Sequence, residues 1–231
     1  MDLNSLAENT TAQGDTAYQL ESLYDMVMNG GPVMVPIGLC SVVALGYTVE
    51  RFVRLAPAKI GNRRFGQGVL EVVREGGPDP GLEACHGKSN PLSRILAEAL
   101  RRWRAGLVER DKAVEDAGAR EVHRMAANLR PLQVVAMLAP LLGLLGTVWG
   151  MIQAFSKLAA ADSLAKPELL ASGISQALVT TAAGLAIAIP TQAAYFYFRG
   201  RIDRFTRMVE DIYVELGEIQ EGRDGGGHAN S

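Results

Sequence analysis

The sequence predicts an all-α integral membrane protein with three transmembrane helices and long helices that extend into the cytoplasm. Three stretches are apolar, uncharged inside and long enough to cross a bilayer, since about 20 residues span the hydrocarbon. Basic residues gather at one end of each stretch, as they do on the cytoplasmic side of membrane helices. The polar block between the first two stretches has apolar residues at helical spacing.

The N-terminal segment, residues 1–29, contains acidic residues but neither lysine nor arginine. It lacks the basic region of a secretory signal. The distribution of basic residues along the rest of the chain predicts that it is an extracytoplasmic (periplasmic) segment. Within it, residues 15–28 can form an amphipathic helix with Leu20, Leu23 and Val27 on one side. Contact with the membrane surface explains such a helix more simply than docking of a specific partner does.

The first transmembrane helix is expected at residues 30–50, with two prolines in its opening turns, where proline is tolerated. A cytoplasmic helical region follows at 51–130. It contains a short helix at 65–75 and another that starts near Asn90, a good N-cap. Few aromatic residues are present, so an isolated globule would have a thin core. We therefore expect these helices to extend the membrane helices and to pack on copies of themselves.

The second transmembrane helix is expected at residues 131–155, a stretch without Asp, Glu, Lys, Arg or His. Pro140 interrupts its backbone hydrogen bonds, and Thr147 places a hydroxyl near its middle. Glycines at helical spacing allow another helix to approach closely in lipid. Three of them lie on this helix, and we expect them to pack helices together: Gly143, Gly146 and Gly150.

A short periplasmic loop at 156–168 precedes the third transmembrane helix, expected at 169–198. Gln176 and Thr180 are four residues apart and share a helix face, and Thr181 lies about 100° further round. Two glycines and a proline complete the pattern of packing and kinking residues on this helix: Gly173, Gly184 and Pro190.

Residues 199–231 are expected to form a cytoplasmic C-terminal helix, followed from residue 222 by a Gly-rich disordered tail. The arginines that follow residue 198 lie on the same side as those after the first span and before the second. The positive-inside rule then puts the N-terminus in the periplasm and the C-terminus in the cytoplasm. This is the layout of a multi-pass protein of a bacterial inner membrane, in contact with lipid.

No catalytic, metal-binding or cofactor-binding constellation is evident, and nothing indicates a nucleic-acid partner. The three histidines are scattered, and Cys85-His86 lacks further ligands at metal-binding spacing. Ser172 and Ser175 have no candidate base in the membrane. Because Asp, Glu or His normally relay protons through a membrane, a proton-binding carboxylate would have to come from another subunit. Without such a subunit, the hydroxyl and small residues would only let helices pack.

Three stretches carry a resemblance to a known family: APLLGLLGTVWGMIQAF (139–155), GISQALVTTAAGLAIAIPTQAAYFYF (173–198) and GGPVMVPIGLCSVVALGYTVERF (30–52). They resemble the MotA/TolQ/ExbB proton channel family, and its ExbB-like branch most closely. The resemblance covers the membrane spans and most of the order of segments along the chain. The polar block resembles the family in its general character only, without a matching motif.

The resemblance implies a ring of identical subunits, taken as a pentamer, around the transmembrane helices of an ExbD-like single-span partner. An aspartate on the partner would take up and release protons. Proton flow would rotate the inner helices, and a TonB-like protein would carry the work to the outer membrane. The chain would then be a subunit of a proton-motive-force-driven motor that energises outer-membrane transport.

Carried over by motif, Thr147 in GTVWG and Thr181 in ALVTTAAG would be pore-facing hydroxyls near that aspartate. Thr180 and Gln176 complete the expected proton pathway, and the sequence leaves open which of Thr180 and Thr181 faces the pore. Gln176 stands where ExbB proteins often have glutamate, so the carboxylate is expected from the partner. Pro140 and Pro190 would shape the pore wall.

Two alternatives remain beside the ExbB-type motor. One is a TolQ-like or stator-like subunit of the same family, and the other is an oligomeric membrane scaffold that does not conduct. Leucine in place of Thr147 or Thr181 would leave a scaffold functional, whereas it would inactivate an assembled motor.

Overall fold

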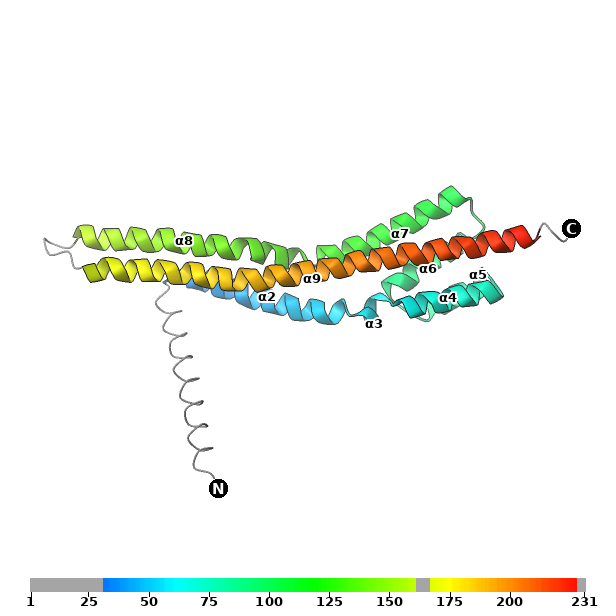
Figure 1. The fold of residues 1–231 in the computed structure, drawn as a ribbon, viewed down its shortest axis with the longest axis horizontal. Coiled ribbons are helices and arrows are strands. Elements are labelled where there is room, and N and C mark those ends of the chain that lie inside the picture. The colour runs from blue at the N-terminus through cyan, green and yellow to red at the C-terminus, as the bar shows by residue number, and fades with distance from the viewer. Residues whose placement is uncertain (1–30, 161–166, 228–231) are drawn as a thin grey trace, which may run out of the picture. The chain divides into compact units, whose positions relative to one another are not determined.

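The computed structural model describes residues 31–160 and 167–227, and every regular element in those two ranges is an α-helix (Figure 1). The helices have the following bounds: α2 Met34–Arg54, α3 Pro57–Ile60, α4 Arg63–Gly76, α5 Pro78–His86, α6 Pro91–Arg101, α7 Leu107–Ala127, α8 Arg130–Ala160 and α9 Pro167–Gly227. The expected helix at 15–28 and residues 161–166 of the expected 156–168 loop lie outside the described residues. The flanks of that loop are helical instead, because α8 continues to Ala160 and α9 begins at Pro167. The predicted fold class is confirmed.

Three stretches of the described chain are long and apolar enough to cross a membrane: Met34–Arg54, Leu107–Ala159 and Leu170–Arg223. Their apolar side chains are largely exposed in the single chain; Val35 and Val42 are 75% and 71% exposed. A water-soluble protein rarely exposes so much contiguous apolar surface. Lipid or other protein chains must therefore cover it.

The chain divides into two compact units. The first comprises Met1–Gly46 and Leu132–Gln192, and the second comprises Tyr47–Pro131 and Ala193–Ser231. In the first unit, α8 and the N-terminal part of α9 run side by side, joined by contacts between small residues (Figure 1). The N-terminal part of α2 completes this unit, with Ile37 and Ala44 buried.

The second unit contains α4 to α7 and the C-terminal part of α9. Leu92, Ile95 and Leu96 on α6 are at most 1% exposed, and α9 contributes Phe198, Ile212 and Leu216 to the buried set. Gly66 lets α4 approach α9 closely, because a Cβ there would collide with the side chain of Ile212. The polar block was expected to have a thin core, but α9 supplies the apolar side that the block lacks.

The local start signals of α4 and α6 are asparagine side chains. Asn62 Oδ1 accepts a hydrogen bond of 2.9 Å from Phe65 N, and Asn90 Oδ1 accepts one of 2.8 Å from Ser93 N. The N-cap expected at Asn90 is thus confirmed, with Pro91 in the first turn.

Two boundaries differ from the expected ones. The glycine- and proline-rich run at 76–80 was expected to end the helix at 65–75 as a loop. It contains only a one-residue break at Gly77, whose φ of 91° suits glycine, and Pro78 already begins α5. At the other end of the chain, α9 continues to Gly227 rather than ending near residue 222. Arg223 stabilises this end by donating to the carbonyl oxygens of Val73 and Arg74, at 3.4 and 2.8 Å, so that it also caps α4.

Candidate functional site

The candidate site lies where α8 and α9 pack within the first unit. At its closest contact with backbone, a Cβ built on Gly184 would lie 2.5 Å from the carbonyl oxygen of Ala139. A Cβ on Gly143 would lie 3.0 Å from the carbonyl oxygen of Thr180 and 3.1 Å from the Cα of Thr181. Backbone therefore meets backbone at these two positions, a contact that only glycine permits.

The other three glycines meet small side chains. A Cβ on Gly146 would collide with the side chain of Thr180, and one on Gly173 with that of Ala154. A Cβ on Gly150 would stand 3.3 Å from that of Ala177. Small residues of α8 thus alternate with small residues of α9 along the contact. Ala154 was not singled out from the sequence, although its position four residues after Gly150 places it on the same helix face.

The two neighbouring threonines of α9 play different parts in this contact. Thr180 is 1% exposed, and its hydroxyl donates to the carbonyl oxygen of Ala177 in its own helix at 2.7 Å. A second, longer contact of 3.4 Å joins Thr180 Oγ1 to the carbonyl oxygen of Gly143. Thr181 is half-buried and donates to that same carbonyl oxygen at 3.2 Å. Only Thr181 keeps part of its side chain accessible from outside the helix pair.

Thr147 lies one helical turn beyond Gly143 on α8 and is half-buried. Its hydroxyl donates to the carbonyl oxygen of Leu144 at 2.6 Å, within its own helix. The side chain lines a shallow, open groove with four apolar neighbours: Val148, Met151, Ile152 and Phe155. Thr147 therefore lies at the edge of the α8–α9 contact, with part of its side chain open to this groove.

Gln176 lies one helical turn before Thr180 on α9. Its side-chain amide packs against the backbone of Gly31, which has a positive φ of 74° at the entry to α2. A Cβ at Gly31 would collide with the amide nitrogen of Gln176, so this contact also requires glycine. Gln176 and Thr180 share a face of α9, but the hydroxyl of Thr180 donates to the carbonyl oxygens of Ala177 and Gly143 rather than to Gln176.

Pro140 and Pro190 both lie inside helices, in α8 and α9 respectively. Each removes one backbone N–H and leaves the carbonyl four residues earlier without its usual donor. Next to Pro190, the buried Thr191 hydroxyl donates to the carbonyl oxygen of Ile187 at 2.7 Å, which adds a hydrogen bond in this weakened turn. The sequence places Thr191 toward the cytosolic end of the third span but assigns it no role.

The chemistry open to this arrangement is hydrogen bonding rather than acid–base catalysis. A threonine hydroxyl has one donor and two acceptor positions, so it can donate to a carboxylate or accept from a carboxylic acid. Residues 131–155 and 169–198 contain no Asp, Glu, Lys, Arg or His. Among the described residues, no group of three or more His, Cys, Asp or Glu side chains is placed to hold a metal ion.

Fold and site together define a polytopic helical membrane protein built on a close-packed, uncharged helix pair. The profile of the MotA/TolQ/ExbB proton channel family matches residues 88–211, over half of the chain. An ExbB homolog from Methanothermobacter thermautotrophicus is 31% identical to this chain. The match covers 79% of this chain and 64% of the length of that relative. The ExbB-like 3 protein of Synechocystis sp. is 30% identical over 84% of this chain and 91% of its own length.

Among solved structures, a chain from the structure of C. jejuni MotAB matches 96% of this chain with a TM-score of 0.63. The two chains are 18% identical in sequence, and the match covers 91% of the solved chain, so the likeness concerns the fold. The chain belongs to the MotA/TolQ/ExbB proton channel family. It is accordingly a multi-pass membrane channel subunit and not an enzyme, as the sequence predicted.

Proposed function

We propose that this chain is the ring-forming subunit of an ExbB-type motor, which uses the proton-motive force to energise a TonB-type system. The observation that carries the proposal is the position of Thr181. Its half-buried hydroxyl contacts the carbonyl oxygen of Gly143, one turn of α8 away from the half-buried Thr147. Two hydroxyls therefore lie close together in two spans that contain no Asp, Glu, Lys, Arg or His.

In this proposal the proton-binding carboxylate belongs to an ExbD-like single-span partner. A partner aspartate would need hydrogen-bond partners in both of its protonation states, because an unsatisfied polar group inside a membrane is costly. Thr147 and Thr181 can donate to the ionised form and accept from the protonated form. Thr180 has a different role in the proposal, since its burial between α8 and α9 makes it a packing residue.

Exposed apolar faces support assembly into a ring of copies, which we take to be a pentamer. Leu178 on α9 and Leu144 on α8 are 64% and 58% exposed in the single chain, close to the proposed hydroxyl positions. The orientation in the proposal follows the basic residues: the N-terminus is periplasmic, the second unit is cytoplasmic, and the membrane is the inner membrane.

The test compares Thr181→Val with Thr181→Ser in the complex of the chain and its single-span partner, reconstituted into liposomes. Valine keeps the shape of the side chain and removes the hydroxyl, whereas serine keeps the hydroxyl. We expect Thr181→Val to lower proton flux at least about tenfold in complexes of unchanged mass, since one hydrogen bond to a charged group is worth about 1.5–3 kcal/mol. Thr181→Ser should retain most of the flux.

A scaffold that does not conduct predicts no difference between these two variants, and equal function of both would end the motor proposal. Flux through liposomes that contain the chain without any partner would contradict the assignment of the carboxylate to the partner. The proteins that co-purify after membrane extraction separate an ExbB-type subunit, with a TonB-like protein, from a TolQ-like or stator-like one.

A further inference from the structure

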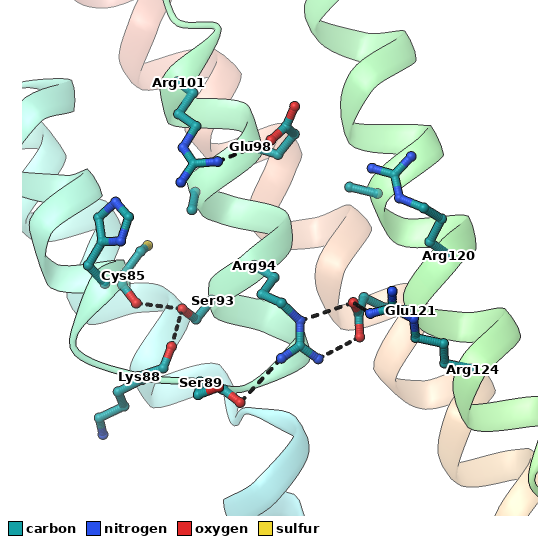
Figure 2. Close-up of a pocket in the computed structure, with 13 residues that line it drawn as sticks. Cys85, Lys88, Ser89, Ser93, Arg94, Glu98, Arg101, Arg120, Glu121 and Arg124 are labelled. Carbon is teal, nitrogen blue, oxygen red and sulfur yellow. Dashed lines mark hydrogen bonds and ion pairs between the residues drawn. The ribbon is translucent and has the colours of Figure 1, made fainter.

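A cavity of about 460 Å³ in the second unit lies apart from the α8–α9 contact and is unused by the proposed proton pathway. It is bounded by α5, α6 and α7. Figure 2 shows that Arg94 and Arg101 enter its wall from α6, and Arg120 and Arg124 from α7. A cavity of this size is in the range that holds a small-molecule ligand.

The wall of the cavity carries an excess of positive charge. It contains four arginines and two glutamates, Glu98 and Glu121, so the arginines outnumber the carboxylates by two before Lys88 is counted. Cys85 does not offset this charge, because burial raises the pKa of its thiol to about 11 and keeps it neutral.

Glu121 is already neutralised. Arg94 binds it with two hydrogen bonds, of 3.0 Å from Nε to Oε1 and 2.6 Å from Nη2 to Oε2. Arg124 adds a third, of 3.1 Å from Nη1 to Oε1. The side chain of Glu121 is 8% exposed, so a ligand cannot displace it into solvent. Two guanidinium groups therefore share one carboxylate, and a positive charge is left over beside the cavity.

Glu98 is turned toward a residue that does not line the cavity. Its closest ion pair is with Arg102, at 3.0 Å, whereas Arg101 lies 3.9 Å away. Arg120 forms no ion pair or hydrogen bond with any residue that the structure describes, although it lines the cavity and is exposed. The guanidinium groups of Arg101 and Arg120, on facing helices, thus keep N–H donors that no acceptor in the described part of the protein uses.

We propose that this cavity binds a phosphate-bearing anion. The planar guanidinium fork matches the oxygens of a phosphate group, and charge-assisted hydrogen bonds of this kind are roughly twice as strong as neutral ones. The anion would lie between Arg101 and Arg120, with Arg94 and Arg124 held in place by Glu121. A soluble phosphate compound and the head group of an anionic phospholipid share this chemistry, and the experiment distinguishes them.

The first arm of the experiment is a calorimetric titration of the full chain in detergent with inorganic pyrophosphate. Arg120→Gln should weaken binding at least about tenfold, because a charge-assisted contact is lost. Arg120 is unpaired in the structure, so its removal leaves no buried carboxylate alone and the variant should fold. Arg64→Gln is the matched control, an exposed arginine of the same unit outside the cavity, and should bind as the parent chain does.

The second arm places the chain in nanodiscs of phosphatidylglycerol or of phosphatidylcholine and measures thermal stability. A gain in phosphatidylglycerol that Arg120→Gln abolishes, together with loss of pyrophosphate binding in those discs, identifies a lipid head group as the source. Pyrophosphate binding that is equal in both lipids identifies a soluble anion.

Three results would overturn the proposal. One is that neither phosphate probe depends on Arg120. Another is that Arg64→Gln weakens binding as much as Arg120→Gln does. The third is that a hexaglutamate peptide binds in an Arg120-dependent way while both phosphate probes fail, which would make the cavity a docking site for an acidic protein segment. None of these results bears on Thr181, so the proton-pathway proposal is tested separately.

Discussion

Gly184 on α9 lies against the carbonyl oxygen of Ala139 on α8, so close that a Cβ at Gly184 would stand 2.5 Å from that oxygen. The carbonyl oxygen of Ala139 belongs to the backbone and cannot move aside as the end of a flexible side chain could. The two helices would therefore have to separate to make room for a methyl group at Gly184. The missing Cβ of Gly184 is thus one of those that allow the short distance between α8 and α9, and the hydroxyl contacts of Thr180 and Thr181 to Gly143 depend on that distance.

Gly184→Ala is therefore expected to destabilise the chain by about 1–3 kcal/mol, the usual cost of overpacking, even though alanine favours helix formation. A lower melting temperature in detergent is the measurement. Gly38→Ala on α2 is the matched control, because no atom lies within 4 Å of its built Cβ. An equal or higher melting temperature for Gly184→Ala than for Gly38→Ala would contradict the close packing.

Thr180→Val separates packing from proton chemistry at the neighbouring position. The hydroxyl of Thr180 is a donor, and its acceptors are helix carbonyl oxygens of Ala177 and Gly143. Its loss removes the donor and leaves carbonyls that can still accept backbone N–H groups. Valine fits the same volume, so we expect a stability change within about 1 kcal/mol and nearly normal proton flux. A loss of flux as large as that expected for Thr181→Val would show that both hydroxyls serve the pathway.

The contrast between these two threonines also shows how far the sequence could lead. The length of each uncharged stretch, the basic residues beside it and the spacing of its glycines can each be read from a single helix. These features were sufficient to predict three spans and a close helix contact. Which of Thr180 and Thr181 lies inside the contact depends on how α9 is rotated against α8. Adjacent residues differ by about 100° around a helix, and only the partner helix decides between them.

The second unit was less predictable for the same reason. Arg94 and Glu121 are 27 residues apart, and only the packing of α6 on α7 brings them to 2.6 Å. The core of the polar block was underestimated because its missing apolar face comes from α9, more than 100 residues later in the chain. The helix α5 was missed because a run rich in glycine and proline indicates a loop, whereas Pro78 is in the first turn of a helix.

The thiol of Cys85 is expected to be inert in the folded protein. Cys85 is 1% exposed, and desolvation by burial raises the pKa of its thiol from 9.0 to about 11. At pH 8 the thiolate, which is the reactive form, is then about a hundredfold scarcer than in the unfolded chain. Alkylation by iodoacetamide in a Cys40→Ser background should accordingly be at least about a hundredfold slower before denaturation than after it.

The same shift has a consequence for stability. Because the folded-state pKa is raised, the contribution of the protonated thiol is fully present below about pH 9 and is lost as the pH rises toward 11. Cys85→Ala should remove that part of the alkaline loss of stability. Rapid alkylation of Cys85 at pH 8 in the folded protein would contradict the burial of this thiol.

Arg94→Ala tests the ion pair that organises the cavity wall. Glu121, whose side chain is 8% exposed beside Arg94, would keep Arg124 as its only partner. Removing one partner of a fully buried pair costs about 3–5 kcal/mol, but the side chain of Arg94 is 45% exposed and Arg124 remains, so we expect about 1–2 kcal/mol. Chemical denaturation of the variant measures this loss.

The matched control is Arg63→Ala, which removes ion pairs of 3.6 Å to Asp211 and Glu215 on the surface of the same unit. Those side chains are all 39–56% exposed, so their loss should change stability by about 0.5 kcal/mol or less. Arg94→Ala/Glu121→Gln should recover part of the stability lost in Arg94→Ala, because the buried carboxylate no longer carries a charge. A double variant less stable than Arg94→Ala alone would mean that the charge of Glu121 is stabilised by groups other than these two arginines.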